Sequence, residues 1–89
     1  MRKWSDVRSE LFTAEEIRES DLRVAIIGEL IKARQEKNIS HQQLEQLSGV
    51  NQLTISRLES GEGGLPFETV MRVLAPLGKT LYIGDLQEA

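Results

Sequence analysis

The stretch SHQQLEQLSGVNQLTISRLES, residues Ser40 to Ser60, decides the fold. It predicts two short helices joined by a tight turn. Ser40, followed three residues later by a glutamine, forms a capping box for the first helix, and Asn51 is a favourable N-cap for the second. Gly49 in the turn and Gly61 after the second helix suit the left-handed backbone with positive φ at which helices often end.

The helical period divides this stretch into an inward apolar face and an outward, mostly polar face. The side chains expected to turn inward together are Leu44, Leu47, Val50, Ile55 and Leu58. Those left facing outward are Gln52, Leu53, Ser56 and Arg57. A short helix with this outer face, held rigidly by its neighbour, suits the major groove of DNA.

This spacing resembles the helix-turn-helix of the XRE family, which includes the phage repressors. The resemblance covers about residues 22–77 and rests on residues at the family's usual offsets, which are Leu44, Gly49, Val50, Ile55, Ser56, Leu58, Glu59 and Gly61. It implies an all-α, lambda-repressor-like domain of four or five helices that binds DNA. The plainer alternative is an ordinary helical hairpin without a ligand, which does not require the full pattern.

Three outward residues of the second helix are expected to read bases. Gln52 can bond N6 and N7 of adenine together, Arg57 can reach a guanine or a phosphate, and Leu53 can touch a thymine methyl group. The resemblance implies the same roles, because the matching positions of the repressors meet bases.

Other residues at this surface are expected to contact phosphates. Asn51, Thr54 and Ser56 are placed for phosphates by their position on the second helix. The resemblance implies further phosphate contacts by His41, Asn51 and Ser60. For each of these residues the alternative is a merely solvated side chain.

The resemblance also implies a structural pair. In the repressors, an arginine on an earlier helix pairs with a glutamate that ends the recognition helix, and Arg34 and Glu59 occupy those places. A two-pronged hydrogen bond between them would fix the angle of the recognition helix. Two residues depart from the family. His41 stands where glutamine is preferred, and Glu45 stands where alanine allows two helices to cross closely, so its carboxylate must reach solvent or find a donor.

The amino-acid composition excludes several kinds of functional site. The 89 residues contain no cysteine and one histidine, which excludes a thiolate metal site, a disulfide framework and a histidine triad. No catalytic motif, cofactor site or membrane-spanning run is present, so we expect a non-enzymatic, cytoplasmic protein. The net charge of −3 is unusual for a DNA-binding protein. Residues 22–60, however, hold five basic and four acidic residues, so most of the acid lies outside the presumed DNA-reading part.

The chain before this stretch predicts two helices. Thr13 and Glu16 form a capping box, which predicts a short helix from Ala14 to about Glu19. A long helix is expected from Leu22 to about Lys37, with Asp21 as its N-cap. The face of the long helix is expected to consist of Val24, Ile27, Leu30, Ile31 and Arg34.

The chain after it predicts a helix and a strand. A helix beginning near Pro66 is expected to pack over the others through Phe67, Val70, Met71, Val73 and Leu74. Residues 79–84, KTLYIG, alternate as a short β-strand, which needs a partner for its backbone. That partner is a second copy, another segment or another protein's sheet; otherwise the segment is a coil whose Leu81 and Ile83 fill the core. The expected division is 1–20 as a leader, 21–78 as the helix-turn-helix domain, and 79–89 as strand and tail.

The chain has a short acidic leader, a long helix, the helix-turn-helix and a last helix that ends in LGKTLYI, residues 77–83. This order of segments resembles the HigA-type antitoxins of type II toxin–antitoxin pairs. The resemblance implies a dimer that binds double-stranded operator DNA, represses its own operon and neutralises a basic, RelE/HigB-like ribonuclease toxin. The leader, through Trp4, Leu11 and Phe12, is then the toxin contact; alternatively it folds back and completes the core. Two other functions stay open: a stand-alone repressor without a toxin, and a protein-interaction adaptor that has lost DNA binding.

Overall fold

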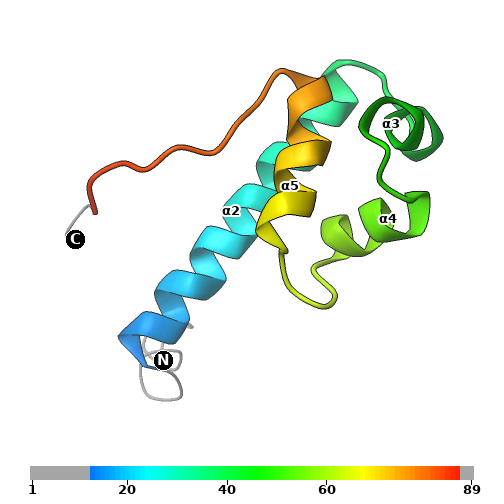
Figure 1. Ribbon diagram of the computed structural model, residues 1–89. Helices are drawn as coiled ribbons and strands as arrows, with labels where there is room; N and C mark the ends of the chain where they lie inside the picture. Colours follow the sequence, from blue (N-terminus) through cyan, green and yellow to red (C-terminus); the bar gives the residue numbers. More distant parts are fainter. Residues whose placement is uncertain (1–12, 87–89) are drawn as a thin grey trace, which may run out of the picture.

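The computed structural model describes residues 13–86, and these form an all-helical domain (Figure 1). The elements are α2 (Ala14–Glu36), α3 (His41–Ser48), α4 (Gln52–Ser60), α5 (Phe67–Leu74) and the 3-10 turn η1 (Ala75–Leu77). α3 packs against α4 and α5, and α4 packs against α2. The all-α prediction is therefore confirmed for the described residues.

Local capping explains where these helices begin and end. Ser40 accepts from the amide of Gln43 at 3.1 Å, and Gln43 accepts from the amide of Ser40 at 2.8 Å, so the predicted capping box is present. The second predicted box, at Thr13, is also formed. Gly49 and Gly61 end α3 and α4 with φ of 75° and 81°, in the left-handed region that glycine adopts without strain.

The region before residue 37 differs from the prediction, because α2 is one continuous helix from Ala14 to Glu36. Asp21 lies inside it and is not an N-cap. No proline interrupts the segment, and the capping box at Thr13 already provides its start, so nothing forces a break near residue 20. The predicted boundary between leader and domain falls within this helix.

The core lies where the C-terminal half of α2 meets the other helices. Its buried residues are Leu30, Ala33, Leu44, Val50, Ile55, Leu58, Val70, Val73, Leu74 and Leu77. Ile26, Ile39, Leu65 and Leu81 pack against it partly buried. Apolar residues from α2, α3, α4 and α5 therefore converge on one core, which places α4 with its opposite face toward solvent.

Three residues expected in the core are exposed instead: Leu47 by 59%, Val24 by 67% and Phe67 by 67%. α3 contributes only Leu44 to the core, and the next core residue along the chain, Val50, follows the turn. The buried residues of α2 lie at Leu30 and beyond, so Val24 extends past the core. Phe67 stands at the first position of α5, one turn before the first buried residue of that helix.

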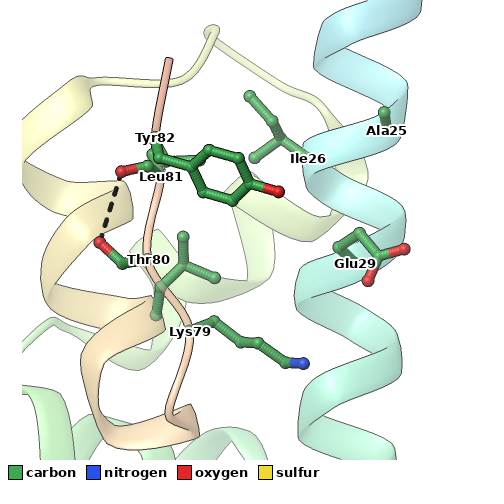
Figure 2. A pocket seen from close by; sticks show the side chains of 8 residues that line it. Ala25, Ile26, Glu29, Lys79, Thr80, Leu81 and Tyr82 are labelled. Atoms are coloured by element: carbon green, nitrogen blue, oxygen red, sulfur yellow. Dashed lines mark hydrogen bonds between the residues drawn. The ribbon is translucent and has the colours of Figure 1, made fainter. Parts of the chain in front are cut away.

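The predicted C-terminal strand is wrong for the described residues, since residues 79–86 follow a path without strand pairing. An isolated segment has no neighbour to satisfy its backbone groups, and the described part of the chain offers none. Leu81 packs against the core, but Ile83 is fully exposed, so the alternative of a core-filling coil holds for Leu81 alone. Leu81 and Tyr82 line a groove of about 380 Å³ beside Ile26 of α2 (Figure 2).

Candidate nucleic-acid interface

The outward face of α4 is exposed as predicted. Gln52, Leu53, Ser56 and Arg57 all face solvent, while Ile55 and Leu58 on the other side of the helix are buried. In Figure 1, α4 lies at the edge of the molecule. This helix therefore presents one polar surface, with Leu53 as its apolar point.

A shallow hollow brings the start of α4 next to α3. Its lining residues are His41, Glu45, Asn51, Gln52, Leu53 and Ser56, and its volume is about 430 Å³. Five of these six belong to the predicted DNA-contacting set. The helix-turn-helix geometry thus gathers residues that are up to 15 positions apart in the sequence, from position 41 to position 56.

The first amides of α4 are bonded within the chain. Asn51 caps the helix as predicted, since its Oδ1 accepts from the amide of Leu53 at 2.7 Å. The amide of Gln52 donates to Oε2 of Glu45, also at 2.7 Å. Glu45 therefore finds the donor that its position requires, and it joins α3 directly to the start of α4.

Glu45 is the residue at this surface to which the sequence gives no contact role. The only feature of the sequence that could have indicated a contact here is the glutamate itself, which stands where the resembling family prefers alanine. The bond crosses the turn and joins residues seven positions apart, so no local capping pattern predicts it.

Arg34 and Glu59 form the two-pronged pair expected from the resemblance. Nε of Arg34 donates to Oε2 of Glu59 at 2.7 Å, and Nη2 donates to Oε1 at 2.9 Å. Nη1 donates to the carbonyl oxygen of Ile39 at 3.0 Å. One guanidinium thus joins α2, the α2–α3 loop and the end of α4, which fixes the tilt of α4 on the core.

Burial alone would raise the pKa of Glu59. The hydrogen bonds and charge of Arg34, together with the nearby His41 imidazole, outweigh that effect and lower the pKa below its ordinary value of 4.5. Glu59 is therefore an ionised carboxylate at neutral pH, and the pair is charged.

His41 faces this carboxylate. Its Nε2 lies 3.1 Å from Oε1 of Glu59, and the same atom is buried without an aligned hydrogen bond in the described part of the chain. The phosphate contact by His41 stays a prediction. In this orientation Nε2 is turned toward Glu59, so the imidazole would have to turn for Nε2 to reach a phosphate.

The remaining predicted residues lie at different places. Thr54 is half-buried on α4. Ser60 lies at the opposite end of that helix, where its hydroxyl donates to the carbonyl oxygen of Arg57 at 3.0 Å. Trp4, Leu11 and Phe12 lie outside the described residues.

Two absences hold for residues 13–86. No group of three or more His, Cys, Asp or Glu side chains is arranged to hold a metal ion in that range. No helix there is both long and apolar enough to cross a membrane.

Comparison with known proteins agrees with this geometry. A family model described as helix-turn-helix matches residues 30–83, a range that contains α3, the turn and α4. The chain belongs to this helix-turn-helix family. The match confirms the XRE-type part of the resemblance, and it points to no catalytic family.

Two relatives resemble this helix-turn-helix protein over nearly its whole length. An uncharacterized HTH-type transcriptional regulator from Haemophilus influenzae is 52% identical over 84 residues, which cover 94% of this chain and 86% of that protein. A solved chain of a toxin–antitoxin module from Streptococcus pneumoniae is 55% identical, with a TM-score of 0.80, and the match covers 97% of this chain and 96% of that one. Both likenesses extend beyond the helix-turn-helix itself.

Proposed function

We propose that this protein is a DNA-binding antitoxin. It binds operator DNA through α4 as a dimer, represses its own operon and neutralises a RelE/HigB-like ribonuclease toxin. The observation that carries the proposal is the exposed polar face of α4, which the Arg34–Glu59 pair holds at a fixed angle. The similarity to a chain of a toxin–antitoxin module supports the second half.

The DNA-binding half follows from the shape and charge of this surface. A short helix that is buried on one side and polar on the other fits the major groove with its first turn at the base edges. Gln52 and Arg57 are exposed on that outer side and are the proposed base readers. A dimer places two such helices about 34 Å apart, which is one helical turn of DNA.

The DNA-binding test compares outer-face variants with a matched control. Gln52→Ala and Arg57→Ala are each expected to weaken operator binding by about 5- to 150-fold, the range for a lost base contact of about 1–3 kcal/mol. Gln35→Ala, an exposed glutamine on α2, is expected to have no effect. Fluorescence anisotropy with the promoter duplex of the protein's own gene measures these affinities. Unchanged affinity in both α4 variants would remove the groove assignment.

The toxin-binding half is supported by the N-terminal part of α2, which lies before the first buried residue of that helix. Leu22 and Val24 are exposed there, among the acidic residues Glu15, Glu16, Glu19 and Asp21. An exposed apolar pair within acidic surface suits a basic protein partner. We therefore propose this part of α2 as a toxin contact, in addition to the proposed contact residues Trp4, Leu11 and Phe12.

The toxin-binding test examines the two proposed contact regions, the start of α2 and residues 1–12, separately. The probe is the product of any neighbouring gene that encodes a small basic RelE-like protein, and isothermal titration calorimetry measures its affinity. Leu22→Asp combined with Val24→Asp is expected to weaken the toxin complex more than tenfold and leave operator binding unchanged. Removal of residues 1–12, which ends before the capping box at Thr13, is expected to weaken the same complex. Operator binding without any toxin binding would leave a stand-alone repressor.

A further inference from the structure

The carboxylate of Glu45 faces the start of α4. Its side chain is partly buried and lines the hollow with His41, Gln52 and Ser56. Its Oε2 accepts from the Gln52 amide at 2.7 Å. A negative charge therefore sits beside the residue that is proposed to read a base.

This contact changes what the N-terminus of α4 attracts. The free amides in the first turn of a helix carry partial positive charge and favour anions such as phosphates. Here the amide of Gln52 donates to Glu45, and the amide of Leu53 donates to the side chain of Asn51. Two of these donors are thus used within the chain, and the carboxylate repels any further anion.

We propose that Glu45 is a specificity-determining residue for DNA binding. Its carboxylate positions Gln52 at the start of α4 and repels phosphates from that point, which weakens non-specific binding more than operator binding. The inference rests on the proposed DNA-binding function and adds a discriminating role to it.

The difference between the two binding modes comes from where α4 lies. On an operator, base contacts fix the position of α4 in the groove, and the predicted phosphate contacts of His41 and Asn51 are made from that fixed position. Non-specific binding is almost wholly phosphate attraction, so the protein shifts to bring its donors onto the backbone. The carboxylate of Glu45 at the start of α4 repels phosphates in that shifted position and therefore disfavours it.

The test removes the charge and keeps the shape. Glu45→Gln keeps an acceptor for the Gln52 amide without the negative charge. Its control is Glu29→Gln, which removes the same charge from the groove face of α2 (Figure 2). Anisotropy titrations over a range of salt use the promoter duplex and a scrambled duplex of equal length.

Glu45→Gln is expected to tighten binding to the scrambled duplex by about fivefold, the size of one surface charge near a helix terminus. The slope of log affinity against log salt should steepen by about one, because one more phosphate is contacted. Promoter binding should change by about twofold or less, since base contacts fix the position of α4 there. Glu45→Asp keeps the charge and is expected to bind the scrambled duplex as the unaltered protein does, while Glu29→Gln shifts both affinities equally.

An equal shift of both affinities by Glu45→Gln, or no shift, would overturn the role of Glu45. The proposed function would survive that result, because the unaltered protein would still bind its promoter in a salt-dependent way. Absence of binding by the unaltered protein to any duplex at low salt would overturn both proposals. Thermal melting of each variant checks that the comparison is made between folded proteins.

Discussion

Replacement of Arg34 by alanine removes three hydrogen bonds at once. Two of them go to Glu59 and one goes to the carbonyl oxygen of Ile39. The side chains of Arg34 and Glu59 are only 16% and 10% exposed, so the remaining carboxylate keeps most of its burial and loses its main partner. Removal of one partner from a buried pair costs about 3–5 kcal/mol, and residual exposure puts this case near about 3 kcal/mol.

That loss is large for a domain of this size. Total folding stabilities are about 5–15 kcal/mol, and about 1 kcal/mol shifts the melting temperature of a 60–100-residue domain by about 4–8 °C. Arg34→Ala is therefore expected to melt about 12–24 °C lower than the unaltered protein. Arg34→Lys keeps the charge but not the fork of donors, so we expect an intermediate loss.

Urea unfolding followed by circular dichroism measures the free energy of unfolding directly. The matched control is Arg18→Ala, which removes an arginine paired with Glu15 on the same helix, where the two side chains are 49% and 75% exposed. Such an exposed pair contributes about 0–1 kcal/mol. If Arg34→Ala costs no more than Arg18→Ala, the reasoning that this pair fixes α4 on the core is refuted.

Three further predictions concern stability. Because the pKa of Glu59 is lowered in the folded state, the ionised carboxylate stabilises the fold at pH values above its ordinary pKa of 4.5. This contribution is lost as the pH falls through the pKa of Glu59 in the folded protein, so Glu59→Gln is expected to flatten the acid side of the stability–pH curve. Gly49→Ala, at φ of 75°, is expected to cost about 1–2 kcal/mol in urea unfolding, whereas Gly28→Ala, inside α2 with open space around it, is expected to stabilise by about 0.5–1 kcal/mol. Leu44→Ala is expected to cost about 2–5 kcal/mol, and Leu47→Ala within about 0.5 kcal/mol of zero; equal losses would contradict the placement of the two leucines.

The sequence alone predicts most helix ends of this domain, but the break that it predicts near Asp21 does not occur. The caps at Thr13, Ser40 and Asn51 depend on bonds between residues two or three positions apart, so the pattern contains all the information they need. The glycine stops depend on one backbone conformation and are equally local. The Arg34–Glu59 pair joins residues 25 positions apart, and only the resemblance to a known family indicated it.

The errors concern how far neighbouring elements extend. A helical period shows which residues share a face, but not whether another helix covers that face, and Val24 and Leu47 are exposed for this reason. The strand prediction at residues 79–84 depends on a partner that the described residues do not provide. The Glu45 contact depends on the exact closure of the turn, which no local pattern sets.

The third hydrogen bond of Arg34 limits how related sequences can diverge. If Arg34 and Glu59 exchanged their identities, the attraction between the two side chains would be kept. The carbonyl oxygen of Ile39, now 3.0 Å from a guanidinium nitrogen, would then face a carboxylate, and two acceptors would repel each other. An exchange of the two charges between these positions is therefore unfavourable. We expect relatives either to retain the arginine and the glutamate in this order or to replace both by apolar residues together.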